Sequence, residues 1–142
     1  MRVHLAIFRQ PYLNLILALR KTIELRLTMH RILPFEGIAI DDKIFLKESG
    51  KKIVGQAFCA KTLFKKLESP SQISKITEQY PQELRIEQGF LEAKLQCKYL
   101  SLIWLRDVTR IDPLPFVKHD QRTWLILDQN TLLDRYIKVK GE

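Results

Sequence analysis

The hydrophobic pattern changes its period twice within the first 28 residues. An apolar run at residues 3–8 predicts a strand, and apolar positions at helical spacing in residues 10–20 predict a short helix, with Pro11 suited to its first turn. Residues 21–28, KTIELRLT, then alternate with period two, which predicts a strand with one apolar face and one polar face. The polar face carries Thr22, Glu24, Arg26 and Thr28.

A β-hairpin is predicted in the middle of the chain. Residues 43–49 and 52–64 are rich in β-favouring residues, and a turn around Gly50 separates them. Gly55 lies inside the second arm and is typical of a β-bulge. The hairpin should therefore have a long second arm with one irregular position.

Two helices are predicted after the hairpin. In residues 69–80, Ser69 and Gln72 have the spacing of a capping box, and apolar residues follow at helical spacing. Apolar residues at similar spacing predict a further helix from about residue 81 to residue 97, with Gly89 as a potential break.

Strands outnumber helices in the predicted order. Strands at residues 99–111 and 122–127 complete the series β, α, β, β, β, α, α, β, β. Short turns join most of the strands, which disfavours a doubly wound parallel sheet with its long crossovers. We therefore predict an α+β fold in which a small mixed or antiparallel sheet curls toward a β-barrel and helices flank it.

Length and composition indicate one globular domain over residues 1–142. Hydrophobic residues make up 46% of the chain, and a chain of this length buries roughly two thirds of the surface that its unfolded form exposes. No apolar run approaches the roughly 20 residues that span a bilayer, and the N-terminus does not have the pattern of a signal peptide. We expect a cytoplasmic protein with no membrane partner. Cys59 and Cys97 are predicted to be small buried residues, not zinc ligands or a disulfide.

The net charge favours a polyanionic partner. Lys and Arg total 24 against 16 Asp and Glu, a formal charge of +8, which is typical of proteins that bind RNA or DNA. Residues 43–66 hold seven lysines and one acidic residue, Glu48, and should form a basic face. A basic protein with no nucleic-acid partner is the alternative. The lysines predicted to contact nucleic acid are Lys43, Lys47, Lys51, Lys52 and Lys61.

The segment ILALRKTIELRL, residues 16–27, crowds charges into one stretch. Glu24 and Arg26 lie two apart on the predicted strand, so their Cα atoms are about 7 Å apart on one face, and Lys21 at the helix-to-strand junction can reach either side. In a closed pocket, Glu24 would accept from an amino group while Arg26 or Lys21 pairs with a carbonyl or phosphate. The alternative is a solvated strand face, with Arg20 complementing the helix dipole.

Other candidate residues carry weaker signals. Tyr12 and Trp124 have side chains that stack on bases, although both types also pack in cores. His4, His30 and His119 show no metal-ligand spacing. We predict no metal and no cofactor, and the sequence does not set the oligomeric state.

The charged segment resembles the signature of the ASCH domain, a member of the PUA-like superfamily of small β-barrels. In that family a helix leads into a strand through G-x-K-x-x-E-x-R. The equivalent positions here are Leu19, Lys21, Glu24 and Arg26, so three of the four residues match. The preceding QPYLNLIL is similar to the family's helix, which usually begins with a polar residue and a proline.

The resemblance extends in layout over residues 1–128. Residues 36–67 are similar to the family's second block, in which a strand begins after a Gly-Asp pair; here the pair is Asp41-Asp42. Leu19 replaces the usual glycine of the signature. We therefore expect the helix to end without a left-handed cap residue.

The resemblance implies two classes of function. Some relatives are RNA-binding modules or ribonucleases, and others are amidohydrolases that act on acetylated cytidine, with a threonine nucleophile where this chain has Glu24. The preferred hypothesis is an RNA- or nucleotide-binding domain with a pocket lined by Lys21, Glu24 and Arg26. The alternative is a small hydrolase of a modified nucleoside amide or of RNA phosphodiesters, with Lys21 as base and Glu24 as acid or electrostatic partner. A third hypothesis is a structural protein whose basic face docks an acidic protein.

Overall fold

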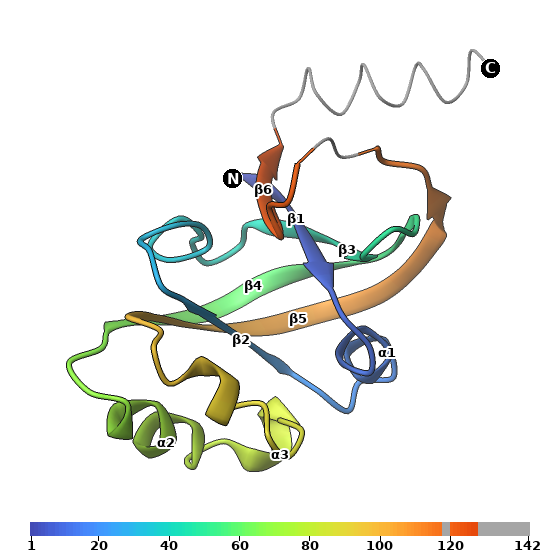
Figure 1. Ribbon diagram of the computed structural model, residues 1–142. Coiled ribbons are helices and arrows are strands. Elements are labelled where there is room, and N and C mark those ends of the chain that lie inside the picture. Colours follow the sequence, from blue (N-terminus) through green and yellow to red (C-terminus); the bar gives the residue numbers. More distant parts are fainter. Residues whose placement is uncertain (118–119, 128–142) are drawn as a thin grey trace.

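Six strands form one curved sheet in the computed structural model, which describes residues 1–117 and 120–127 (Figure 1). Across the sheet the order is β2-β5-β4-β3-β1-β6. β1 and β3 run parallel and the other neighbouring pairs run antiparallel, so the predicted mixed sheet, curled into a half-barrel, is confirmed. The strands are β1 (Val3–Phe8), β2 (Ile23–Thr28), β3 (Lys43–Glu48), β4 (Ile53–Lys66), β5 (Tyr99–Leu114) and β6 (Trp124–Leu127).

β2 lies in the connection between the two parallel strands, β1 and β3. Parallel neighbours need a crossover connection, and here the chain passes from β1 through α1 (Tyr12–Leu17) and β2 before it returns to β3. β2 pairs with β5 at one edge of the sheet, while β1 lies near the other edge between β3 and β6. The curvature of the half-barrel brings these two regions back toward each other.

The apolar face of β2 packs as its period predicts. Ile23, Leu25 and Leu27 are buried in one cluster with Ile73 of α2 (Ser71–Thr77) and Leu84 of α3 (Pro81–Leu84). Figure 1 shows these two helices together on one side of β2 and β5, away from β1. The burial of three aliphatic side chains on one strand contributes several kcal/mol and fixes the register of β2, because a slip of one residue would expose all three.

The irregularity predicted at Gly55 is confirmed. Leu46 pairs with Gly55 but Lys47 pairs with Ile53, so Val54 is an extra residue in β4. A Cβ atom on Gly55 would lie 2.7 Å from Leu17 Cδ2 and 3.1 Å from the Thr109 carbonyl oxygen. A larger residue would displace the Leu17 side chain and crowd the Thr109 carbonyl, so glycine suits this close approach of α1 and β5 to the bulge.

The helices after the hairpin are shorter than predicted. A helix over residues 81–97 is wrong: α3 ends at Leu84, Arg85 adopts a left-handed φ of 52°, and only a single 3₁₀ turn, η1 (Glu92–Lys94), follows before β5. The hydrophobic spacing does not reflect a helix here. Ile86, Phe90 and Leu91 lie in an irregular segment, and each packs against the cluster that contains the apolar residues of β2.

The prediction of a capping box at Ser69 is also wrong, because the side chains of Ser69 and Gln72 form other hydrogen bonds. The Ser69 hydroxyl pairs with the Ser71 hydroxyl, and Gln72 Oε1 accepts a hydrogen bond from the Glu68 amide at 2.7 Å. Gln72 therefore bonds to the amide one residue before Ser69, and the residue immediately before the helix is Pro70 and not Ser69.

The end of α1 corrects the expectation for Leu19. Leu19 has a left-handed φ of 62° although it is not glycine. The Leu19 amide donates to the Ile16 carbonyl at 3.0 Å and the Arg20 amide donates to the Leu15 carbonyl at 2.9 Å, the two bonds of a Schellman motif. The helix therefore keeps its left-handed cap despite the substitution.

Parts of the chain fall outside this description. The structure is described neither for residues 118–119, which include His119, nor for residues 128–142. Within the described ranges, no helix combines the length and apolar character needed to cross a membrane. Cys59 is buried, Cys97 is half-buried and both are free thiols.

Candidate ligand-binding site

Lys21, Glu24 and Arg26 form one contiguous ionic cluster. Glu24 Oε1 lies 3.5 Å from Lys21 Nζ, and Arg26 Nε donates to Glu24 Oε2 at 2.9 Å. Glu24 Oε1 also accepts from the Leu25 amide at 3.0 Å. Lys21 is 2% exposed and Glu24 6%, so these charges do not form a solvated strand face.

The ammonium of Lys21 is held on two sides. Its Nζ donates to the Leu84 carbonyl at 2.6 Å, at the end of α3, and faces Glu24 on β2. Burial lowers the pKa of Lys21, while the neighbouring carboxylate of Glu24 opposes that shift. Lys21 is therefore a buried cation whose charge depends on its partner.

Arg26 bridges the open seam of the half-barrel between β2 and β1. Its Nη2 donates to the Ile7 carbonyl at 2.9 Å and its Nη1 to the Thr123 carbonyl at 3.3 Å. The guanidinium lies over the rings of Phe8 and Trp124, with centroid distances of 4.9 and 5.2 Å. Cation–π contacts and carbonyl acceptors therefore fix Arg26 from the opposite side of the seam.

Trp124 packs against the side of Arg26 that faces away from the cavity. It is 3% exposed and does not line the cavity, so in this structure it packs beneath Arg26 and presents no face for stacking on a ligand. Its Nε1 donates to His4 Nδ1 at 3.0 Å, which leaves His4 Nε2 to donate to Asp42 at 2.9 Å. Burial lowers the pKa of His4, which favours this neutral tautomer. His4 is therefore part of the scaffold under the site.

A cavity of about 550 Å³ lies over the cluster. Lys21, Glu24 and Arg26 line it, together with Tyr12, which the sequence indicated as an aromatic candidate. Lys21 Nζ lies 5.3 Å from the Tyr12 ring centroid, and the Tyr12 ring meets Phe90 edge-on at 5.8 Å. One wall of the cavity is therefore aromatic and begins at a buried cation.

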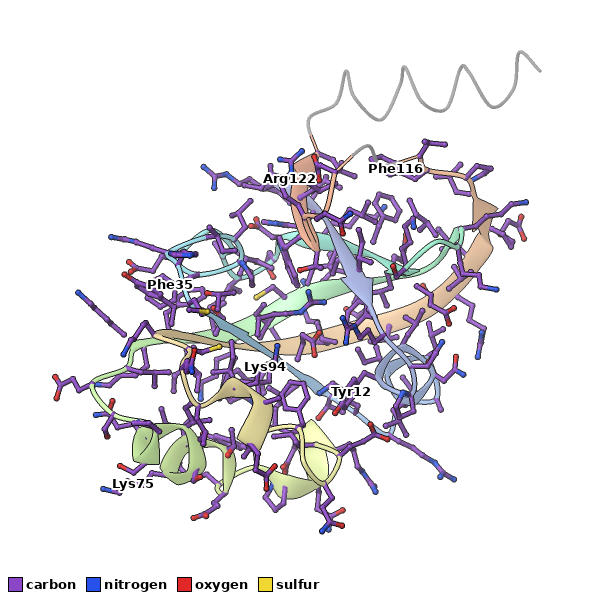
Figure 2. The ribbon with its side chains drawn as sticks, viewed as in Figure 1. Tyr12, Phe35, Lys75, Lys94, Phe116 and Arg122 are labelled. Carbon is purple, nitrogen blue, oxygen red and sulfur yellow. The ribbon has the colours of Figure 1, made fainter. Side chains whose placement is uncertain are left out.

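The segment 86–94 forms the outer wall, which the sequence reasoning missed. Phe90 and Lys94 from this segment line the cavity, and the Glu87 amide donates to the Tyr12 hydroxyl at 3.2 Å. In Figure 2, Tyr12 and Lys94 lie beside β2, whereas Lys75 lies on the outer side of α2. No local signal marks these residues, since they reach the site only through the long connection between α3 and β5.

Solved structures of an ASCH protein from Zymomonas mobilis resemble this chain over nearly its whole length. One has a TM-score of 0.72 at 14% identity and covers 96% of this chain and 94% of its own. A tyrosine-to-phenylalanine variant scores 0.73 at 14% identity with coverage of 94% and 96%, and a serine-to-alanine variant scores 0.72 at 15% identity with coverage of 93% and 92%. The chain has the ASCH fold. No protein-family model and no curated protein matches the sequence.

The ASCH fold separates the lysines that were predicted to share one basic face. Lys47 is 4% exposed and its Nζ donates to the Glu48 carbonyl, so the prediction that it is available to phosphates is wrong. The cause is the strand alternation, which places Lys47 on the same side of β3 as Phe45, whose ring packs against the cluster that contains Ile53.

The remaining lysines of this group lie at different places on the ASCH sheet. Lys43 is half-buried over Phe45, and Lys61 is exposed over Trp104. Lys51 and Lys52 are exposed in the turn before β4, about 30 Å from Lys61 along an extended strand. The candidate contacts are therefore divided between the hairpin turn and the middle of β4.

Proposed function

We propose that this ASCH-fold domain binds RNA or a nucleotide-like ligand, with a base in the cavity over Lys21, Glu24 and Arg26. The observation that carries the proposal is a carboxylate held between two cations at the buried floor of a partly aromatic cavity. Buried ionic groups cost free energy unless they are paired. Ligand recognition is a functional reason for keeping such a cluster beside an open cavity.

The cluster retains hydrogen-bonding capacity after its internal bonds are counted. Of the five N–H groups of Arg26, three are used, by Glu24, Ile7 and Thr123. Glu24 Oε2 accepts one bond and has a second lone pair. An acceptor next to a donor is the pattern that complements the amino and carbonyl groups along the edge of a base.

The size and walls of the cavity support the same ligand class. A volume of about 550 Å³ is within the usual range of small-molecule pockets. Tyr12 and Phe90 offer aromatic surface, and stacking of a base on an aromatic side chain contributes about 1–3 kcal/mol. A flat, polar-edged ring therefore matches both the floor and the wall.

The test is the substitution Glu24→Gln, which removes the acceptor charge and keeps the shape. We expect weaker or altered binding across a panel of the four ribonucleosides and short RNAs, because the base edge loses its carboxylate partner. Unfolding should also become easier by more than about 1 kcal/mol, since Lys21 and Arg26 lose the charge between them. Calorimetric titration and thermal melting measure the two effects.

The matched control is Glu36→Gln, at an exposed ion pair with Arg31. Its effect on stability should stay within about 1 kcal/mol and its effect on binding near zero. Binding isotherms and melting curves of Glu24→Gln that overlay those of the unchanged protein would remove the basis for the proposed site.

One observation favours the hydrolase as second candidate. Burial lowers the pKa of Lys21, which is the shift that a lysine general base needs near neutral pH. The test is incubation with N4-acetylcytidine and, separately, with labelled RNA, with and without a divalent metal. We expect little hydrolysis of the amide, because the charged neighbour Glu24 favours protonated Lys21. Rapid acetate release that disappears in Lys21→Ala would reverse the order of the two candidates.

A further inference from the structure

The charged residues that line the cavity do not balance. Among the described lining residues are four cations and two carboxylates, a net charge of +2 with both carboxylates ionised. The floor accounts for part of this, because Glu24 is shared between Lys21 and Arg26. Outside this cluster, which has a net charge of +1, the lining holds two further cations, Arg9 and Lys94, and one further carboxylate, Glu87.

Arg9, which directly follows β1, and Lys94, in segment 86–94, line the cavity from different elements. One wall runs from buried Lys21 to Tyr12, then to Phe90, and ends at Lys94, whose Nζ is 5.6 Å from the Phe90 centroid. On the other side of the seam, exposed Arg9 directly follows Phe8, and the guanidinium of Arg26 lies over the Phe8 ring. Both cations therefore lie nearer to solvent than the floor.

Neither outer cation has an acidic partner within the ranges that the structure describes. The ion pairs there involve Lys21, Arg26, Arg31, Arg106, Arg122 and His4, and none involves Arg9 or Lys94. Their charges remain available to a ligand. The floor differs, since its cations are already engaged with Glu24 and with backbone carbonyls.

We propose that the ligand of this cavity is a phosphomonoester, with the base on the floor and the terminal phosphate between Arg9 and Lys94. This inference rests on the proposed function. A phosphomonoester carries about −1.5 to −2 charges near pH 7, which matches the net charge of the lining, whereas an internal phosphodiester carries one. Phosphate oxygens accept charge-assisted hydrogen bonds from both types of side chain.

Two sources share this chemistry, a free mononucleotide and the phosphorylated end of an RNA chain. The experiment therefore titrates two matched sets into the full chain: ribonucleosides against their 5′- and 3′-monophosphates, and short RNAs with phosphorylated against hydroxyl ends. The proteins compared are the unchanged chain, the double variant Arg9→Gln with Lys94→Gln, and the control Lys75→Gln. Lys75 is exposed on α2 and does not line the cavity.

For the unchanged chain and the Lys75→Gln control, we expect at least one phosphorylated probe to bind about tenfold or more tightly than its unphosphorylated counterpart. In the double variant this ratio should fall below about threefold, while the affinity for the unphosphorylated probe stays the same. A melting curve like that of the unchanged chain shows that the double variant is folded. The set in which the ratio appears identifies the source of the phosphate.

The contrary outcomes are distinguishable. If unphosphorylated and phosphorylated probes bind the unchanged chain equally well, the phosphate inference is overturned and the base pocket stands. A ratio that persists in the double variant also overturns it, because the phosphate would then lie elsewhere. If no probe in either set binds, the proposed function fails, and the phosphate inference fails with it.

Discussion

Leu19 and Asp41 hold backbone conformations that favour glycine. Their φ angles are 62° and 75°, and the ASCH-like pattern has glycine at both positions. A left-handed conformation costs an ordinary L-residue roughly 1–2 kcal/mol, but Asp tolerates it better than Leu because its short side chain bonds locally. The chain therefore adopts both left-handed conformations without glycine, at a local cost in stability.

This cost can be measured by restoring glycine. Leu19→Gly should raise the free energy of unfolding by up to about 1 kcal/mol, since relief of the strained φ exceeds the entropy that glycine adds to the unfolded chain. Leu19 is 66% exposed, so little packing is removed. Denaturant unfolding measures the change.

Asp41→Gly is the comparison, and its gain should be smaller, because Asp41 also pairs with Arg106 at 2.8 Å. A destabilised Leu19→Gly would contradict the strain argument.

At the scale of elements, the lysines of the β3–β4 hairpin differ in exposure between its turn and its strands. Lys51 and Lys52 extend from the turn, which Gly50 closes with a φ of 75°, whereas Lys47 is turned into the packed side of β3. Exposed neighbouring lysines occur in the turn and also at the far end of β4, at residues 65–66. The turn is therefore one of two places on the hairpin suited to meet a phosphate backbone.

Changing Lys51 and Lys52 together to Ala should weaken binding to a mixed RNA pool. Each phosphate that a lysine neutralises releases counterions, so the slope of log affinity against log salt should become shallower by about 0.7 for each single-strand phosphate that is no longer neutralised. Stability should change by no more than about half a kcal/mol. Fluorescence titrations at several salt concentrations give the slope.

The control is the pair Lys75→Ala with Lys98→Ala, two exposed lysines away from the hairpin turn. In this control, the slope of log affinity against log salt should lie closer to that of the unchanged chain than the slope of the Lys51 and Lys52 variant does. RNA binding that does not depend on salt would argue against nucleic acid as the partner.

At the scale of the whole molecule, the site exists because the sheet does not close. β2 and β6 are the two edges of the sheet, and Arg26 spans the seam by bonding to Ile7 and Thr123 across it. The cavity occupies this same seam, with lining residues from β1, α1, β2 and segment 86–94. Ligand binding and closure of the half-barrel are therefore linked through Arg26.

Arg26→Lys tests that link. Lysine keeps the charge but cannot reach two carbonyls and Glu24 with a planar fork, so we expect a decrease of roughly 1–3 kcal/mol in unfolding free energy. Hydrogen exchange should quicken in β2 more than in β4. The control Arg31→Lys changes an exposed pair with Glu36 and should have little effect on either measurement. Equal exchange in β2 before and after Arg26→Lys would show that the bridge does not hold the seam.

The sequence by itself determined the strands, the bulge at Gly55 and the apolar face of β2. These features depend on local pattern: side chains alternate on a strand, and glycine inside a strand marks a place where neighbouring segments approach closely. It also brought Lys21, Glu24 and Arg26 together as one group, because they lie within six residues at a helix-to-strand junction. Local spacing was sufficient for those predictions.

The tertiary structure alone decided which polar residues are buried and which segments meet. Glu24 is buried although its strand alternates like a surface strand, because the curved sheet and segment 86–94 enclose it. Lys47 lies on the side of β3 where Phe45 packs against the cluster of Ile53. The helix predicted to extend beyond Leu84 stops there because Arg85 turns left-handed and the later apolar residues pack one by one. Burial depends on what covers a residue, and that covering comes from parts of the chain more than sixty residues away.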